Sequence, residues 1–332
     1  MAAPAYGFEL VAPSAPLRLR AMDVPRPGAG DVIVQVAGCG VCHTDIGFAR
    51  GDVPTRKPLP MVLGHEIAGR VVAAGERATA WLGSNVIVPA VIACGQCAAC
   101  RAGHSTICRN QFMPGNDGDG GFATHVRIPA RGLCPVPNSL PPGITLESLA
   151  VVADAVSTPF EAIRRSGLQP GEVAVIVGAG GIGGFGVQIA AARGATVIAI
   201  DVDAERLRLA AEHGAALALN AAGVDEKQIK GEVLEAARRA APGSTLKIFE
   251  MSGTAAGQRT AFSLLTFGAY MAVVGFTLQK IELRLSNLMA FDATLRGNWG
   301  CPADQYPAAL DLVLAGQVKI EPFIERHPLA HA

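Results

Sequence analysis

Four of the eight cysteines lie close together, in the pattern Cys94-x-x-Cys97-x-x-Cys100-x7-Cys108. Four thiolates saturate a tetrahedral zinc ion and leave no position for a substrate. The spacing therefore predicts a structural zinc site, which would stabilise a lobe that has few apolar residues of its own. Four independent buried cysteines in a loop of glycine and polar residues would leave this regular spacing unexplained.

A second group of candidate metal ligands is dispersed along the chain. Cys42 lies in the run GCGVCHTD, and His65 lies in the run GHE. One Cys and one His from separate strand ends form an incomplete ligand shell, which a catalytic zinc needs if it is to keep an open position. Taken alone, these two residues also fit ordinary structural roles, because a lone histidine is more often a surface or core residue than a ligand.

A glycine-rich turn follows a strongly apolar stretch and opens an alanine-rich one. Its pattern, G-x-G-x-x-G, is typical of a turn that binds the pyrophosphate of a dinucleotide at a helix N-terminus. The first glycine permits the tight turn, the second lets backbone N–H groups approach the phosphates, and the third lets the helix pack on the strand. The residues expected to contact the cofactor are Gly178, Gly180, Gly181, Ile182 and Gly183.

An acidic residue, Asp201, ends the next predicted strand. A carboxylate at this place accepts hydrogen bonds from the adenosine ribose hydroxyls and repels a 2′-phosphate, so NAD is favoured over NADP. The alternatives are a glycine-rich turn without a ligand and an Asp201 that only caps the following helix.

The elements that position these residues fall into two groups. Up to about Pro137, short β-branched or alternating runs predict an irregular, mostly β domain, with strands at Asp31–Val36, Glu66–Val72 and Asn85–Pro89. From about Ser157, strands and helices alternate, which indicates parallel βαβ units. The predicted elements are strands at Glu172–Val177, Thr196–Ile200, Ala216–Leu219, Lys247–Glu250 and Tyr270–Gly275, and helices at Ile182–Arg193 and Ala204–His213.

Composition narrows the class of protein. The 332 residues are 50% hydrophobic and 17% charged, which excludes disorder as the dominant state and favours two domains. With 28 basic and 28 acidic residues, no net field attracts nucleic acid or anionic lipid. The N-terminus has no secretory leader, and the uncharged window Val173–Ala192 is better explained by the glycine-rich turn than by a membrane span. We therefore expect a soluble, cytoplasmic protein that binds neither nucleic acid nor membrane.

The order of these motifs resembles that of the zinc-dependent medium-chain alcohol dehydrogenases. The runs CHTD and GHE, the four-cysteine loop, the segment Gly120–Ala123 (GGFA) and the glycine-rich turn follow one another as in that family. The resemblance implies an α/β fold: an irregular β-rich, GroES-like catalytic domain over residues 1–155 and a Rossmann doubly wound parallel sheet for NAD over 156–300. Residues 301–332 would return to the catalytic domain. Relatives usually continue past the position of Ala332, so the resemblance also implies an early C-terminus.

The resemblance also implies roles for individual residues. Cys42 and His65 match ligands of the catalytic zinc, and Glu66 matches an acid that can approach or exchange onto the metal. Thr44 matches the hydroxyl residue that takes the alcohol proton, and Asp45 matches the carboxylate that orients the ligand histidine.

The resemblance leaves alternatives open at three further positions. Asp154 takes the place of the third zinc ligand, and with the Cys42 thiolate it would balance the charge of Zn²⁺; alternatively, it caps the helix that follows. His43 matches a position near the cofactor phosphates, or it is a solvated loop residue. Gly47 stands where many relatives carry a histidine that passes the proton to water, which leaves the proton's exit route open.

A closer resemblance is to the 6-hydroxycyclohex-1-ene-1-carbonyl-CoA dehydrogenases of anaerobic benzoyl-CoA degradation. It rests on AGCGVCHTD (Ala37–Asp45), ADAVSTP (Ala153–Pro159), SGTAAGQ (Ser252–Gln258), LSNLMAF (Leu285–Phe291), GNWGC (Gly297–Cys301) and FIERHPL (Phe323–Leu329). It implies oxidation of a ring hydroxyl on a CoA thioester. Arg50, Arg56 and Lys57 would then be candidates to contact the CoA phosphates, or they are solvated surface charges.

Other functions fit parts of the same pattern. These are a dehydrogenase of primary or benzylic alcohols, a non-catalytic NAD-binding protein that retains only the structural zinc, and an enoyl-CoA hydratase whose zinc activates water. The stretch Tyr270–Leu285 is β-rich and could pair across a two-fold axis as in relatives. We therefore expect a homodimer or homotetramer.

Overall fold

The computed structural model describes residues 5–331, which form two compact units. The first unit runs to Ser157 and also includes Gly300–Leu314 and the segment from Ile324 onward. The second unit comprises Thr158–Trp299 and Ala315–Phe323. Within the described residues, no helix has both the length and the apolar character needed to cross a membrane.

The first unit is built around a five-stranded antiparallel sheet with the order β7-β3-β5-β6-β8. Its strands are β3 (Asp31–Gly40), β5 (Glu66–Ala74), β6 (Asn85–Val88), β7 (His125–Pro129) and β8 (Cys134–Val136). Alternate β-branched residues such as Val32 and Val34 on β3 and Ile67 and Val71 on β5 enter one apolar core. This alternation is the period of two that predicts half-buried strands.

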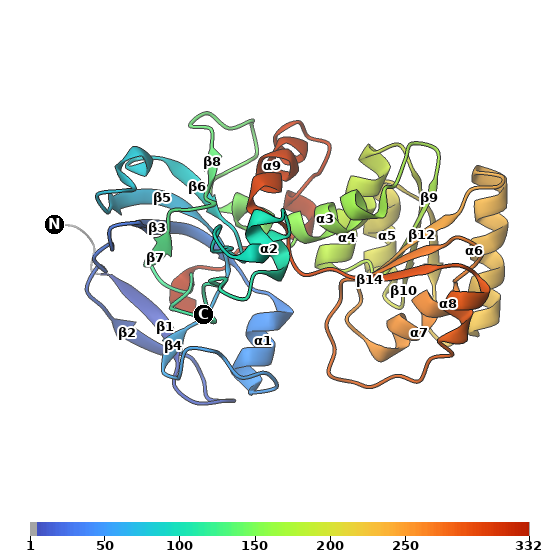
Figure 1. Ribbon diagram of the computed structural model, residues 1–332, viewed down its shortest axis with the longest axis horizontal. Coiled ribbons are helices and arrows are strands. Elements are labelled where there is room, and N and C mark those ends of the chain that lie inside the picture. Colours follow the sequence, from blue (N-terminus) through green and yellow to red (C-terminus); the bar gives the residue numbers. More distant parts are fainter. Residues whose placement is uncertain (1–4, 332) are drawn as a thin grey trace. The chain divides into compact units, whose positions relative to one another are not determined.

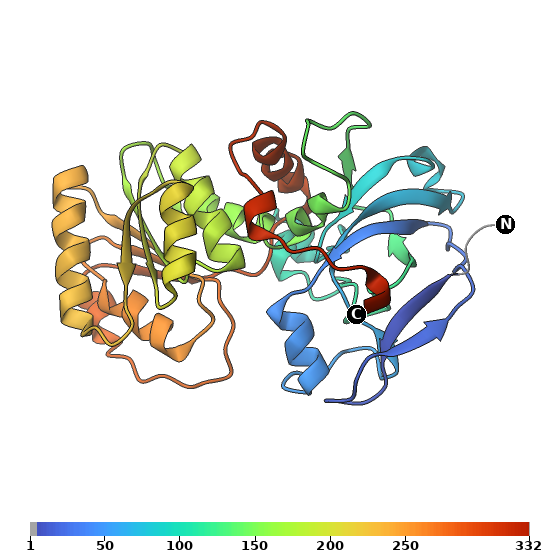
Figure 2. The ribbon, with the colours of Figure 1, turned by 180° about the vertical axis from the view of Figure 1, so that it is seen from behind.

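A smaller sheet in the same unit has the strand order β2-β1-β4. Its strands are β1 (Tyr6–Leu10), β2 (Arg18–Ala21) and β4 (Met61–Val62). Strands β1 and β4 share a core with Phe48 of helix α1 (His43–Arg50) and with Leu329 near the C-terminus. Figure 2 shows this C-terminal segment lying beside the blue N-terminal strands.

The second unit contains a six-stranded parallel sheet with the order β11-β10-β9-β12-β13-β14 (Figure 1). Its strands are β9 (Val173–Val177), β10 (Thr196–Asp201), β11 (Ala215–Asn220), β12 (Leu246–Glu250), β13 (Tyr270–Val273) and β14 (Thr294–Gly297). The chain starts at the centre, runs outward to one edge, and then returns to build the other half. This is the Rossmann order, so the predicted doubly wound α/β fold is confirmed.

Helices cover both faces of this sheet. Helices α4 (Gly181–Ala192) and α5 (Ala204–Glu212) contact each other and the strands β9, β10 and β11, whereas α6 (Glu226–Ala240) and α7 (Ala255–Ser263) pack together. Residues of α6 and α7 share a core with the odd-numbered valines of β9, such as Val175. Because β9 is covered on both faces, all five of its residues are buried, as its continuous apolar run predicts.

The remaining helices are short and connect or flank the sheets. They are α2 (Ala98–Arg101), α3 (Ser157–Ser166), α8 (Ser286–Ala290) and α9 (Tyr306–Leu314), together with the 3₁₀ segments η1 (Thr79–Trp81), η2 (Ser105–Ile107), η3 (Ser148–Ala153), η4 (Ala303–Gln305), η5 (Glu321–Phe323) and η6 (Leu329–His331).

The outer edge of the parallel sheet differs from the sequence prediction. Strand β13 ends at Val273, and no strand follows it up to Leu285 within the described chain. The edge is instead β14, which the sequence pattern did not reveal. All four residues of β14 are exposed, so the strand lacks the apolar alternation that marks a half-buried one.

The four-cysteine loop brings its thiols together. The sulfur atoms of Cys97 and Cys100 lie 3.4 Å apart, those of Cys97 and Cys108 3.8 Å, and those of Cys94 and Cys100 4.0 Å. A tetrahedral zinc ion with Zn–S bonds of about 2.3 Å separates its sulfur ligands by about 3.8 Å. The backbone amides of Gln96 and Cys97 lower the pKa of the Cys94 thiol to about 6, which favours the thiolate that binds metal. The loop therefore fits a structural zinc.

Replacing one of these thiols tests the structural zinc. We expect Cys100→Ser to lose one zinc ion per chain and to lower Tm by roughly 5 °C or more, because metal binding contributes directly to folding. Metal analysis and a thermal melt measure both effects. Cys134→Ser removes a buried thiol on β8, outside the loop, and should keep the full metal content. An unchanged zinc content in Cys100→Ser would contradict a site of four thiolates.

Candidate metal and dinucleotide sites

Cys42 is positioned by the start of helix α1, of which it is the N-cap. Its backbone N–H donates to Asp45 Oδ2 at 3.0 Å, and its Sγ accepts from the backbone N–H of Thr44 at 3.5 Å. This reciprocal pair is a capping box, which satisfies amide groups that the first helical turn leaves without partners. The helix start thus holds the Cys42 sulfur in a defined direction.

Asp45 connects this helix to the segment that carries His65. The buried Asp45 Oδ1 accepts from the backbone N–H of Gly64 at 3.1 Å and lies 3.2 Å from His65 Nδ1. A carboxylate can only accept, so Nδ1 carries the proton in this contact and Nε2 remains available as a ligand. Asp45 thus fixes the orientation of the His65 ring, and its role at a metal site stays a prediction.

Four potential ligands converge at one point in the first unit. The ligand atoms of Cys42, His65, Glu66 and Asp154 all lie within 4.8 Å of one another. Asp154 directly follows η3, and its Oδ2 lies 3.6 Å from His65 Nε2 and 3.8 Å from Cys42 Sγ. The structure therefore places Asp154 against the two motif residues rather than only at the start of the next helix.

Acidic groups outnumber basic groups in this cluster, so a bound cation would offset their negative charge. Burial raises the pKa of the Cys42 thiol, and burial together with Asp154 raises that of Glu66 well above its usual value. Burial alone would lower the pKa of His65, but Asp45 and Asp154 outweigh it and raise the pKa well above 6.5. Two carboxylates and a thiol thus face a single imidazole. One sulfur, one nitrogen and carboxylate oxygens are ligands that Zn²⁺ accepts, so the donor set fits this metal.

The other predicted residues of this region lie on α1. Thr44 is half-buried in the first turn of the helix, next to the Cys42 sulfur, and His43 is exposed beside it. Gly47 lies within the helix and would accept a Cβ, since no atom lies within 4 Å of that position. The position would therefore tolerate a side chain at its Cβ.

The glycine-rich turn lies between β9 and α4, as its pattern predicts. Gly178 has a φ of +93°, and a Cβ there would lie 2.5 Å from the backbone of Ser252. A Cβ on Gly183 would lie 1.7 Å from the Gly178 carbonyl oxygen. Gly180 is the N-cap of α4, and the first N–H groups of a helix lack partners inside it. These amides form a site suited to a pyrophosphate.

The carboxylate of Asp201 accepts several hydrogen bonds from the backbone. Its Oδ2 accepts from the backbone N–H of Ala179 at 2.6 Å, and its Oδ1 accepts from those of Val202 and Asp203 at 2.7 and 3.0 Å. The carboxylate thus ties the glycine-rich turn to the end of β10. Since each oxygen can accept two hydrogen bonds, Oδ2 keeps one position for a ribose hydroxyl. The N-cap of α5 is Asp203, not Asp201.

One residue of this site was missed in the sequence. The guanidinium of Arg206, in the first turn of α5, lies 3.6 Å from the Cβ position of Gly180. A cation beside the N-cap of α4 adds to the attraction for phosphate or ribose oxygens. The available signal was its position five residues after Asp201, on the helix that follows strand β10.

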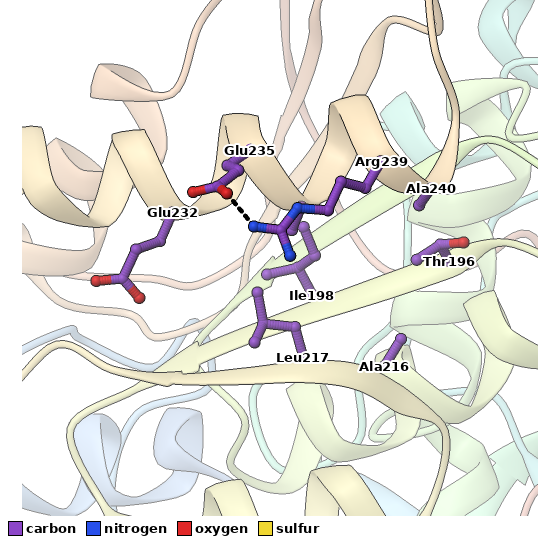
Figure 3. A pocket seen from close by; sticks show the side chains of 9 residues that line it. Thr196, Ile198, Ala216, Leu217, Glu232, Glu235, Arg239 and Ala240 are labelled. Atoms are coloured by element: carbon purple, nitrogen blue, oxygen red, sulfur yellow. Dashed lines mark hydrogen bonds and ion pairs between the residues drawn. The ribbon is translucent and has the colours of Figure 1, made fainter.

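A groove on the second unit is separate from these sites (Figure 3). It lies between α6 and the strands β10 and β11, and the Glu235–Arg239 ion pair lies beside it. Thr196 and Ala216 line it at the beginnings of their strands. Ligands of such sheets bind at the carboxyl ends of the strands, so this groove does not belong to the dinucleotide site.

Comparisons with known proteins identify the family of the chain. The family model described as the alcohol dehydrogenase GroES-like domain matches residues 28–138, and the model described as zinc-binding dehydrogenase matches residues 181–315. An alcohol dehydrogenase from Geobacillus stearothermophilus is 31% identical over 93% of this chain and 88% of its own length. One from Rhizobium meliloti is 33% identical over 91% and 86%.

A solved structure gives the same result. The alcohol dehydrogenase from Aeropyrum pernix superposes with a TM-score of 0.87 at 30% identity, covering 98% of this chain and 94% of its own. The prediction of a GroES-like domain and a Rossmann sheet is therefore confirmed. The chain belongs to the zinc-binding alcohol dehydrogenase family, whose members are oxidoreductases that use a nicotinamide dinucleotide and act on small molecules.

Proposed function

We propose that this dehydrogenase oxidises a secondary alcohol, transfers hydride to NAD, and holds its catalytic zinc with Cys42, His65 and Asp154. The observation that supports this best is the contrast between its two ligand sets. The four-cysteine loop offers four thiols and closes its shell, whereas the second cluster offers Cys42, His65 and Asp154, with the Glu66 carboxylate as a fourth group that can exchange onto the metal. Three protein ligands leave a position for the substrate.

The residues around this set have distinct tasks. When bound, zinc supplies a Lewis acid that lowers the pKa of a substrate hydroxyl. The hydroxyl of Thr44, whose backbone N–H contacts the Cys42 sulfur, takes the alcohol proton. Asp45 holds the His65 ring so that Nε2 faces the metal. Glu66 completes the cluster with Cys42, His65 and Asp154, and its carboxylate can exchange onto the metal.

The cofactor is bound by the second unit. The amides at the start of α4, from Gly180 to Gly183, hold the pyrophosphate. The role of His43 near the phosphates stays a prediction from the family resemblance. Asp201 accepts from the ribose, and Arg206 contributes positive charge beside Gly180. A carboxylate at the ribose disfavours the 2′-phosphate of NADP, although one solved relative, from Sinorhizobium meliloti, was bound to NADP.

We assign the substrate to hydroxyl groups on the ring of a CoA thioester, as in 6-hydroxycyclohex-1-ene-1-carbonyl-CoA. The support is the set of sequence segments outside the general dehydrogenase pattern. Ion pairs reduce the number of basic side chains that can bind the CoA phosphates. Arg56 pairs with Asp117, and Lys57 pairs with Asp119. Arg50, exposed at the end of α1, is therefore the better candidate for a CoA phosphate.

Steady-state NADH formation tests the substrate. We expect kcat/KM for 6-hydroxycyclohex-1-ene-1-carbonyl-CoA to exceed that for benzyl alcohol at least about tenfold, and both activities to vanish with a zinc chelator, because the hydroxyl must be acidified. Arg50→Ala should raise KM for the thioester and leave the rate with benzyl alcohol unchanged.

Three results would redirect the assignment. A higher kcat/KM for benzyl alcohol would make the protein a simple alcohol dehydrogenase. Addition of water to the enoyl thioester without NADH formation would make it a hydratase. One zinc ion per chain without turnover would make it a non-catalytic binding protein.

Replacing Asp201 tests the preference for NAD. We expect Asp201→Ala to raise KM for NAD by roughly 10-fold or more and to weaken the discrimination against NADP, because it removes both a charged acceptor and the repulsion of the 2′-phosphate. The ratio of kcat/KM for the two cofactors is the measurement. Asp203→Ala removes the neighbouring N-cap of α5 and should keep that ratio. An unchanged ratio in Asp201→Ala would assign Asp201 a structural role alone.

We further propose a homodimer that pairs through the β14 edge. In the described chain, β14 ends the order of the parallel sheet. Exposed apolar side chains gather in the same part of the sequence, with Phe276 67%, Leu285 63% and Met289 78% exposed. An exposed edge strand flanked by apolar side chains is a template for pairing with a second chain.

Charge placed at this edge should prevent the pairing. We expect the double variant Met289→Glu, Leu295→Glu to sediment as a monomer, whereas the parent chain sediments as a dimer or tetramer. Leu82→Glu alters a leucine of the first unit that is even more exposed than Leu295 (60% against 37%) and should leave the assembly intact. A parent chain that sediments as a monomer would exclude the proposed pairing.

A further inference from the structure

Helix α9 carries a tyrosine deep in the first unit. Tyr306 starts this helix and is 1% exposed, and α9 packs on η3 and β8. The helix contributes Ala309, Leu310 and Val313 to the interior as well. The ring of Tyr306 alone would fill this space, so the reason for a hydroxyl group must lie in its polar contacts.

The hydroxyl group of Tyr306 has two partners on the backbone. It donates to the Ala153 carbonyl oxygen at 2.6 Å and accepts from the Ala90 N–H at 3.1 Å. The same carbonyl also accepts from Ser157 Oγ at 3.2 Å and from the Ala90 N–H at 3.3 Å. Three donors on a single buried carbonyl restrain it far more than ordinary packing does.

This carbonyl belongs to the residue directly before Asp154. Asp154 ends η3 with a φ of −142° and a ψ of −59°, so no continuing helix holds it. An aspartate side chain is short, and the position of its carboxylate follows the backbone closely. The Asp154 Oδ2 distances of 3.6 Å to His65 Nε2 and 3.8 Å to Cys42 Sγ therefore depend on where Ala153 is held.

We propose that Tyr306 is a positioning residue for the catalytic zinc: its hydroxyl holds the Ala153 carbonyl and thereby places the Asp154 carboxylate against His65 and Cys42. The inference rests on the proposed function, in which Asp154 is a zinc ligand. Through Tyr306, the C-terminal part of the chain would then help to position a metal site whose ligands all lie before residue 155.

The variant Tyr306→Phe removes the hydroxyl and keeps the ring. The Ala90 N–H and the Ala153 carbonyl retain partners in each other and in Ser157, so the fold should persist. We expect zinc at the catalytic site to bind about 10- to 100-fold more weakly, the range seen when groups that orient metal ligands are removed. Competition with a chromogenic chelator measures this, and the zinc of the four-cysteine loop serves as an internal reference.

A spectroscopic readout separates positioning from stability. With cobalt(II) at the catalytic site, the visible absorption depends on ligand geometry, so Tyr306→Phe should change it. Tyr270→Phe makes the same chemical change at a half-buried position on β13, in the second unit, and should alter neither the zinc affinity nor the cobalt spectrum.

Asp154→Asn separates the positioning role of Tyr306 from the role of Asp154 as a zinc ligand. If Asp154→Asn loses the catalytic zinc while Tyr306→Phe keeps the parent affinity and spectrum, the role of Tyr306 is overturned and the zinc site stands. If Asp154→Asn also keeps the parent affinity and spectrum, Asp154 is not a ligand and the proposed site itself fails. Weakened zinc binding in both variants, with Tyr270→Phe unchanged, supports the positioning role.

Discussion

The buried Asp45 carboxylate is the contact on which the candidate catalytic centre depends. It accepts from the Cys42 N–H, the Gly64 N–H and the His65 ring, and so joins a helix start to the strand segment that carries the second ligand. A carboxylate that lost these donors in the interior would face a large desolvation cost. One side chain thus caps α1, orients the imidazole, and supplies negative charge next to the site of a cation.

In the second unit, buried carboxylates likewise accept hydrogen bonds from the backbone of the turns. Asp201, at the end of β10, accepts hydrogen bonds from the backbone N–H groups of Ala179, Val202 and Asp203. Glu250, at the end of β12, accepts from the N–H and hydroxyl of Ser252 and from the N–H of Gly253. The Ser252 backbone in turn lies against Gly178. The turns at the carboxyl edge of the sheet are therefore held by acceptors that come from its own strands.

The two metal sites differ in how their ligands are assembled. The four cysteines lie within one loop, so local backbone geometry brings their sulfurs together. The open site instead draws on three separate segments, and Asp154 is 112 residues from Cys42. Such a site relies on the antiparallel pairing of β3 and β5 and on η3, which contacts both strands. These elements hold donors that lie far apart in the sequence within reach of one another.

The sequence by itself determined the features that local chemistry sets. These are the thiol spacing of the structural site, the glycine-rich turn, and the strand and helix periods of the second unit. Only the tertiary structure decided which distant groups meet: Asp154 with His65, Tyr306 with Ala153, and Arg206 with Gly180. It also revealed the exposed strand β14. The physical reason is that periodicity reports the burial of neighbours along the chain, whereas long-range contacts follow from how whole elements pack.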